Sequence, residues 1–339
     1  MGSVARIKHG IPFVRFLLVA LLLSLPVSKA PVSCAQEPSQ PIRIRVDRVN
    51  VGVIVTDSNG HFVETLHREN FHIFDNGVEQ TLTDFATVEE PAQVLLLLEA
   101  GPAVYLFEGS HLQAAYALFQ GLLPDDRVAI VKYAEAPQAV LDFTTDKQAA
   151  AAALEQVPFN LGFGTLNLSS SLAKLLEWEA GVQGKKTIVL LSTGIDTSPA
   201  KDTGRVLQQL KISDVRVLAV SLAAGLQNGD PGNKKKPATA KPAQMVQEFE
   251  HAGQFLQRIA EASGGRAYFP ASAKEFRDVY AEIAQLVRHE YSLGFAPPLK
   301  DGLVHSIEVR VDATPNASRA APSNYRIDYR RAYLASAPQ

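Results

Sequence analysis

Polar residues whose side chains carry oxygen follow or precede regular apolar segments at three places in this sequence. These residues are Glu99, Thr165, Asn167, Thr193 and Asp196. Glu99 follows the apolar run 94–98, and Thr193 and Asp196 follow the run 187–192. Thr165 and Asn167 lie in the glycine-containing segment 162–167. Such side chains can hold a cation or bind a partner's polar groups, and a carboxylate can act as a general base. If the runs are parallel strands, their carboxyl ends meet at one edge of a sheet, and the three segments predict one site.

Sequence patterns of common enzyme classes are absent. The chain has no G-x-S-x-G, no H-E-x-x-H and no phosphate-binding P-loop pattern. The segment 162–164 begins like a dinucleotide-binding fingerprint, but Asn167 occupies the third glycine position. The histidines from His61 to His305 are scattered without metal-ligand spacing, so we expect solvated or capping roles for them. These absences favour a protein that is not an enzyme.

Strand-like and helical segments alternate between residues 91 and 289. The strand-like segments are 94–98, 128–134, 139–143, 187–192, 215–222 and 267–269. The helical segments are 106–123, 146–157 (with a start favoured by Thr145), 168–179, 203–211, 245–262 and 274–289. This alternation predicts an α/β domain over 91–289, with a mostly parallel, Rossmann-like sheet and helices on both faces. Residues 225–243 interrupt the pattern with lysines, glycines and prolines, which predicts a mobile basic loop.

Antiparallel β segments flank this region on both sides. Residues 42–90 contain short alternating runs separated by Asn-Gly turns, which indicates an N-terminal β module. Residues 290–335 contain C-terminal strands at 291–295, 304–311 and 325–333. Neither flank has enough strands to be stable alone. We therefore expect the flanks to pair into one β-sandwich-like module with the α/β domain inserted between them.

The first 35 residues predict a secretory signal peptide. A basic stretch precedes the apolar run 16–25, and small residues follow at 33–35. The apolar run is shorter than the ~20 residues of a membrane-spanning helix, although a short N-terminal anchor is the alternative. Pro31, three residues before Cys34, argues against lipidation of that cysteine. We expect an exported protein, periplasmic or secreted, with a lead-in at 36–41 and no membrane span after cleavage.

Composition excludes several further classes of protein. The chain has 339 residues, which is enough for two domains. Its net charge is −2, so it lacks the excess of positive charge that is typical of nucleic-acid-binding proteins. A single cysteine excludes a disulfide framework within the chain and a cysteine-based zinc site. Composition therefore excludes these classes of protein but does not identify a function.

The order of elements and the three polar segments resemble the von Willebrand factor type A domain. The wider chain is similar to bacterial exported proteins that carry a VWFA-related domain. The segments outside the α/β pattern that carry this resemblance are 53–57 (VIVTD), 70–77 (NFHIFDNG), 260–265 (AEASGG) and 290–295 (EYSLGF).

The resemblance implies a metal-ion-dependent adhesion site, in which a D-x-S-x-S loop, a threonine and an aspartate hold a divalent cation. Here Glu99 stands at the first aspartate position, Gly101 and Ala103 stand at the two serine positions, and Thr193 stands at the last aspartate position. Only Thr165 matches. Two hydroxyl ligands are missing and one carboxylate is longer, whereas Mg²⁺ demands near-ideal octahedral geometry. We predict a degenerate site with no cofactor, and a bound magnesium ion is the alternative.

The leading hypothesis is an exported, non-enzymatic, adhesion-type module that binds a protein partner at the carboxyl edge of the sheet. Its binding residues would be Glu99, Thr165, Asn167 and Asp196. We expect backbone N–H groups at the next helix start to hold Glu99, and Asp196 to cap the segment that follows it. One alternative is a passive envelope scaffold that acts through the β module. Another is a hydrolase that uses the same cleft, with Glu99 or Asp196 as general base.

Overall fold

The computed structural model describes residues 48–88, 91–101, 108–157, 164–223, 243–312 and 325–337. Several predicted features lie outside these residues. They are the signal peptide at 1–35 with Cys34, the lead-in at 36–41, Ala103 and nearly all of the basic loop 225–243.

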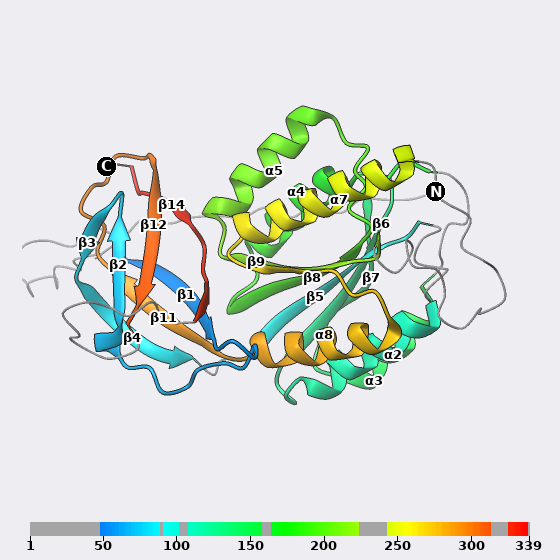
Figure 1. Cartoon of the computed structure of the whole chain (residues 1–339), viewed down its shortest axis with the longest axis horizontal. Helices are drawn as coiled ribbons and strands as arrows, with labels where there is room; N and C mark the ends of the chain where they lie inside the picture. The colour runs from blue at the N-terminus through cyan, green and yellow to red at the C-terminus, as the bar shows by residue number, and fades with distance from the viewer. Residues whose placement is uncertain are drawn as a thin grey trace, which may run out of the picture. The chain divides into compact units, whose positions relative to one another are not determined.

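Six strands form the central sheet of an α/β domain, in the order β10-β9-β8-β5-β6-β7 (Figure 1). They are β5 (Ala92–Glu99), β6 (Arg127–Tyr133), β7 (Pro137–Thr144), β8 (Lys185–Ser192), β9 (Val215–Ser221) and β10 (Arg266–Tyr268). All neighbours are parallel except β6 and β7, because the three residues between these two strands leave no room for a crossover. The predicted mostly parallel sheet is confirmed.

Helices cover both faces of this sheet, as the sequence predicts. Helices α2 (Glu108–Gly121), α3 (Lys147–Glu155) and α8 (Ala273–Leu286) pack on one face, and α4 (Leu168–Glu179), α5 (Ala200–Ile212) and α7 (Ala243–Ala262) pack on the other (Figure 1). The inner strands β5, β6, β8 and β9 are buried on both sides, as their uninterrupted apolar runs require, whereas the edge strand β7 is only partly buried. The start of α3 differs from the prediction. Its N-cap is Asp146 rather than Thr145, and the Asp146 carboxylate accepts hydrogen bonds from the backbone N–H groups of Gln148 and Ala149.

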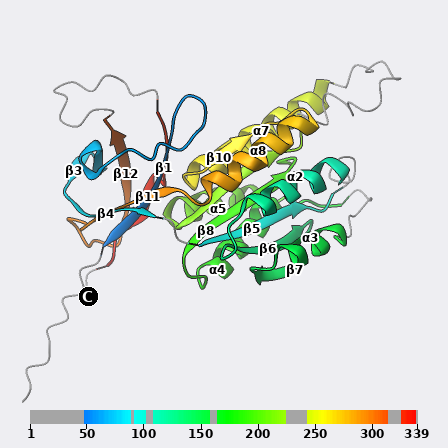
Figure 2. The ribbon, with the colours of Figure 1, turned by 90° about the horizontal axis from the view of Figure 1, so that it is seen from below.

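Strands from the two flanks of the α/β domain pair with each other. One sheet has the order β13-β1-β11-β4, and the other has the order β14-β12-β2-β3. Figure 2 shows β1 and β4 of the N-terminal flank beside β11 of the C-terminal flank. The strands are β1 (Val49–Thr56), β2 (Phe71–Asp75), β3 (Val78–Gln80), β4 (Leu82–Val88), β11 (Glu290–Phe295), β12 (Val304–Val311), β13 (Arg326–Asp328) and β14 (Ala332–Leu334). A short 3-10 helix, η1 (Arg68–Asn70), precedes β2. The segment expected as one strand at 325–333 is two strands, β13 and β14, which belong to different sheets.

The two sheets share one apolar core. Inward residues of β1 and β11, such as Val53 and Leu293, pack in the same cluster as Ile73 of β2 and Val309 of β12. This arrangement is the β-sandwich expected from the two flanks, and each of its sheets needs strands from both ends of the chain.

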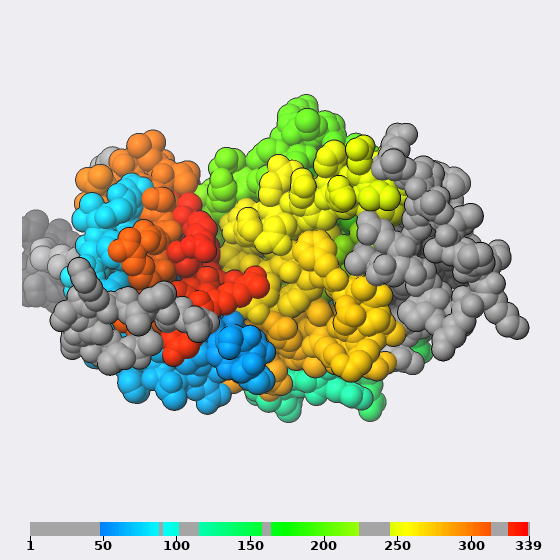
Figure 3. Space-filling view, viewed as in Figure 1, coloured from blue at the N-terminus to red at the C-terminus, as the bar shows by residue number. Residues whose placement is uncertain are grey.

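The α/β domain and the sandwich are in direct contact. The turn after α7 carries Gly264 at φ +71°, where a Cβ atom would lie 2.2 Å from the backbone carbon of Tyr329. Strand β14 also contacts α5, and Figure 3 shows this red C-terminal strand against the α/β domain.

No helix among the described residues has the length and apolar character needed to cross a membrane.

Candidate functional site

Glu99 lies where the carboxyl ends of three strands meet. It ends β5, between β6 and β8, where the strand order reverses and α/β sheets place their ligand sites. Its Oε2 atom accepts hydrogen bonds from Thr193 N and Thr193 Oγ1, both at 2.8 Å, and from Ser192 Oγ at 3.0 Å. The Tyr133 hydroxyl, at the end of β6, donates to the same oxygen at 3.3 Å. Among the described residues, the backbone N–H that holds Glu99 comes from the end of β8, whereas most of the segment between β5 and α2, where the helix start was expected to donate, lies outside the described residues.

The Glu99 carboxyl group is almost fully enclosed, at 1% exposure. Burial raises its pKa, although the hydrogen bonds from Thr193, Ser192 and Tyr133 act in the opposite direction. Its Oε1 atom has no hydrogen-bond partner within the described ranges. Burial and the neighbouring Glu99 also raise the pKa of Tyr133 well above its usual value. The arrangement links three strand ends and keeps Glu99 out of reach of a substrate in solvent.

Asp196 connects two elements. Its Oδ1 atom accepts a hydrogen bond from Ser198 N at 3.1 Å, which agrees with the expected cap on the following segment. Its Oδ2 atom accepts from Ser169 N at 3.3 Å and from Ser169 Oγ, so it also caps the first turn of α4. A negatively charged carboxylate at this position stabilises the helix, because the N-terminal end of the helix dipole is positive. The prediction missed this second cap because the two segments are far apart in the sequence.

Asn167 holds the loop before α4 to its neighbours. Its Nδ2 atom donates to Glu135 O at 3.0 Å, and its backbone N–H donates to Ala134 O at 2.8 Å. Its Oδ1 atom accepts from Thr197 Oγ1 at 3.0 Å. Thr165 lies in the same loop with an exposed side chain. The structure thus brings the predicted segments to one edge, and hydrogen bonds join the loops there.

An open groove of about 870 Å³ adjoins these loops. Its walls include Ala100 after β5, the turn between β6 and β7, and the exposed side of α4. Charged groups of both signs line it: Lys132, Lys174, Arg205, Glu135 and Glu177. Asn167 and Ser170 add polar groups that can donate or accept hydrogen bonds. Among the described residues, this groove is a concave surface at the carboxyl edge with room for a ligand.

The donor atoms at this edge do not fit a magnesium site of the kind that the resemblance implies. Glu99 Oε2 is surrounded by hydrogen-bond donors, and Gly101 brings no side-chain oxygen to the remaining Oε1. Asp196 is engaged in two caps. Throughout the described part of the chain, no three His, Cys, Asp or Glu residues are grouped so that they could hold a metal ion.

Sequence reasoning missed two members of the cluster, Tyr133 and Ser192. Both lie in segments that the sequence predicts as strands, and each is the last residue of its strand in the structure. The rule that selected Glu99, namely that side chains at strand ends converge, applies equally to them. The prediction considered only residues beyond the strands, and therefore omitted these two hydroxyl groups.

The family model of the von Willebrand factor type A domain matches residues 107–282, which is 176 of the 339 residues. The chain therefore belongs to the von Willebrand factor type A domain family. Domains of this family are generally protein-interaction modules. A comparison with curated protein sequences gave no match.

Several solved structures are similar in fold. An aerotolerance-related membrane protein from Bacteroides fragilis is 13% identical, with a TM-score of 0.43, over 58% of this chain and 98% of that chain. A von Willebrand factor type A protein from Catenulispora acidiphila is 11% identical, with a TM-score of 0.45, over 81% of this chain and 76% of that chain. The manganese-loaded TRAP protein from Plasmodium vivax is 10% identical, with a TM-score of 0.41, over 78% of this chain and 99% of that chain.

Proposed function

We propose that this protein binds a protein partner in the groove at the carboxyl edge of the α/β sheet. The supporting observation is that the groove adjoins three loops already held together through Glu99, Asn167 and Asp196. Loops that are ordered before binding lose little conformational entropy when a partner arrives, and this improves affinity. Because the groove carries charges of both signs, it favours a partner whose contact surface also carries both signs.

Binding in this proposal requires no divalent cation and no catalysis. Glu99 is buried and hydrogen-bonded, and Asp196 caps α4, so neither carboxylate faces the groove as a metal ligand or a general base would. The direct test is the melting temperature of the purified protein in EDTA and then with Mg²⁺, Mn²⁺ or Ca²⁺. A cation at 100 times its Kd would add about 2.7 kcal/mol to stability. We expect no shift. A shift that disappears in Glu99→Ala and persists in Lys274→Ala, on the exposed side of α8, would contradict the proposal.

The place of action in this proposal is outside the cytoplasm, in the periplasm or the medium. The support is the basic, apolar and small-residue pattern of residues 1–35. Cell fractionation of the full chain, beside a chain that lacks residues 1–35, tests it. Equal distribution of the two proteins would contradict export.

Site-specific crosslinking can locate the partner surface. A photoreactive residue in place of Lys174, in the groove, should capture a specific protein, whereas one in place of exposed Lys274 should not. Arg205→Glu, which reverses a charge in the groove, should reduce the capture from position 174. Arg310→Glu is the matched control, because Arg310 is exposed on the sandwich.

A second candidate function is the scaffold that acts through the sandwich. Its support is a group of apolar side chains, Leu303, Val304 and Leu334, each more than half exposed at one end of the β12–β14 pair. Capture of a specific protein from position 334, with none from position 174, would favour this function over the groove.

A further inference from the structure

A second pocket lies at the opposite, amino edge of the α/β sheet, where the sandwich meets the starts of β8 and β9. Its volume is about 300 Å³, at the lower end for small-molecule sites. Small and uncharged residues form much of its lining: Asn50, Gly52, Gly184, Ser213, Ser263 and Ser292. Pockets at domain contacts are common ligand sites.

The charged groups of this pocket do not balance. Four cations line it (Lys185, Lys186, Arg216 and Arg330), and two carboxylates do so (Asp214 and Glu290). The side chains of Lys185, Lys186 and Arg216 are only 6%, 5% and 10% exposed. Buried charges in proteins are normally paired, so an excess of two positive charges in such a space calls for a counter-charge.

Among these four cations, Arg330 is the one for which the described residues provide no close ion pair, and it is attracted only at longer range by Asp214. Lys186 Nζ lies 2.8 Å from Asp214 Oδ2, and Glu290 is shared by two cations, with Arg216 Nη1 3.0 Å from its Oε2 and Lys185 Nζ 4.0 Å from its Oε1. Within the described ranges, the only group that Arg330 bonds is a neutral one, the backbone carbonyl of Asn50. Burial also lowers the pKa of Arg330, although the negative charge of Asp214 acts in the opposite direction.

One further carboxyl group, that of Glu179, interacts with Lys186 and Asp214. Burial raises its pKa to about 7, so it carries only part of a negative charge at neutral pH. Its two oxygens have no hydrogen-bond partner in the described part of the chain. Glu179 therefore does not supply the two missing negative charges.

We propose that this pocket binds a small phosphate-type dianion, either free phosphate or a phosphate monoester. A phosphate group carries a charge of about −1.5 to −2 at neutral pH and offers three or more acceptor oxygens, which match the charge excess and the donors of Arg330, Lys186 and Ser292. Lys185, Lys186 and Arg216 belong to the α/β domain, whereas Arg330 and Ser292 belong to the sandwich side. A bound dianion therefore connects the two domains at their contact.

Binding of inorganic phosphate and of glycerol phosphate to the purified protein tests this proposal. Isothermal titration calorimetry at constant ionic strength should show saturable binding of at least one of these two ligands. The melting temperature of the protein should rise as the concentration of that ligand rises. Succinate, a dicarboxylate dianion of different shape, should bind at least about tenfold more weakly, which corresponds to 1.4 kcal/mol. Preference for the monoester over free phosphate would identify the ester as the source of the phosphate group.

Two variants locate the site. Arg330→Gln should weaken phosphate binding about tenfold or more, because it removes a charged hydrogen-bond donor. Arg310→Gln, an exposed arginine of the sandwich, should leave binding unchanged. Ser292→Asp places a carboxylate in the pocket, so it should abolish phosphate binding and raise the melting temperature without phosphate. Absence of saturable binding, equal binding of succinate, or unchanged binding in Ser292→Asp would each overturn the proposal.

Discussion

At the C-terminal end of α4, the carboxyl group of Glu179 is fully buried, and neither of its oxygens has a hydrogen-bond partner in the described structure. Burial raises its pKa from 4.5 to about 7; Lys186 acts against this shift and Asp214 reinforces it. A carboxyl group in this position favours its protonated form, so its environment couples folding to pH.

This coupling predicts a definite pH dependence of stability. The folded protein keeps the Glu179 proton at pH values where the unfolded chain, with a pKa near 4.5, has lost it. The stabilisation is therefore complete below pH 4.5 and is lost as the pH rises towards 7, by at most about 3 kcal/mol. Urea unfolding of wild type and Glu179→Gln between pH 5 and pH 8 measures it.

The glutamine variant should lack the slope over this window, and Glu177→Gln should retain it, because Glu177 is exposed on the same helix. Equal slopes in wild type and Glu179→Gln would contradict the assignment.

His305 shows where prediction from residue type fails. We expected a solvated or capping histidine, but its ring is buried, with Nδ1 2.8 Å from Asp75 Oδ1 and Nε2 3.2 Å from Asp301 Oδ1. Burial lowers its pKa, yet the hydrogen bonds with the two aspartates outweigh burial and the pKa is raised. The signal was present, since the buried positions of β12 alternate and His305 occupies one of them. Its partner Asp75 could not be predicted, because strand pairing sets that contact.

At the scale of elements, strongly periodic segments were predicted well. The helix expected at 168–179 and the strand expected at 304–311 have the same bounds in α4 and β12. Each has a clear repeat of apolar residues, and this repeat depends only on local sequence. The segment 325–333 was predicted poorly, because its division into β13 and β14 depends on which sheet each half joins.

The candidate site was predicted in part for the same reason. Strand ends converge in any parallel sheet, so Glu99, Asn167 and Asp196 could be assigned to one edge from the sequence. The hydrogen bonds from Tyr133 and Thr193 to Glu99, and the groove beside α4, depend on the positions of side chains on different elements.

Replacing a glycine by alanine should change the stability of the protein in opposite directions at two positions, one in a turn and one inside a helix. Gly264 has φ +71°, and an added Cβ would lie 2.2 Å from Tyr329 C, so Gly264→Ala should destabilise the protein by more than about 3 kcal/mol. Gly204 lies inside α5 with nothing within 4 Å of an added Cβ. Gly204→Ala should therefore stabilise the protein by about 1 kcal/mol. Urea unfolding measures both, and a neutral Gly264→Ala would show that the turn does not need this backbone conformation.

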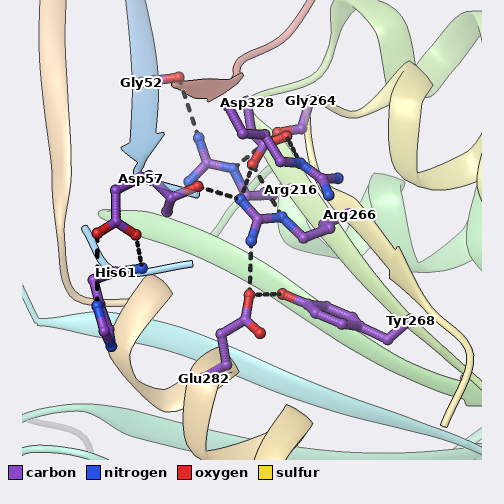
Figure 4. A network of polar contacts seen from close by, with 11 residues as sticks. Gly52, Asp57, His61, Arg216, Gly264, Arg266, Tyr268, Glu282 and Asp328 are labelled. Atoms are coloured by element: carbon purple, nitrogen blue, oxygen red, sulfur yellow. Dashed lines mark hydrogen bonds and ion pairs between the residues drawn. The ribbon is translucent and has the colours of Figure 1, made fainter. Parts of the chain in front are cut away.

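At the scale of the whole described molecule, two arginines of the α/β domain reach the sandwich (Figure 4). Arg216 of β9 donates to Gly52 O at 3.1 Å and pairs with Glu290. Arg266 of β10 bonds Asp328 of β13 and Thr56 of β1, and it pairs with Glu282 of α8 at 2.6 Å. Buried arginines that bond several acceptors fix the relative position of the elements they join.

We expect Arg266→Gln to weaken the contact between the two domains. The substitution leaves Asp328 without its buried partner, and loss of one member of a buried ion pair costs about 3–5 kcal/mol. Calorimetry should show a lower melting temperature and a broadened or divided transition.

Arg326→Gln is the matched control, because Arg326 bonds the same Asp328 but its side chain is 51% exposed. Its loss should cost no more than about 1 kcal/mol. Similar melting curves for the two variants would contradict a role for Arg266 in joining the domains.

The insertion of the α/β domain between β4 and β11 has a consequence for protein synthesis. Strands β1 to β4 leave the ribosome about 200 residues before β11, the strand that pairs with both β1 and β4. The α/β domain contains all the strands of its own sheet and can fold while translation continues. The first half of the sandwich must wait with its apolar faces uncovered until the last strands emerge, and in that interval a chaperone would protect it from aggregation.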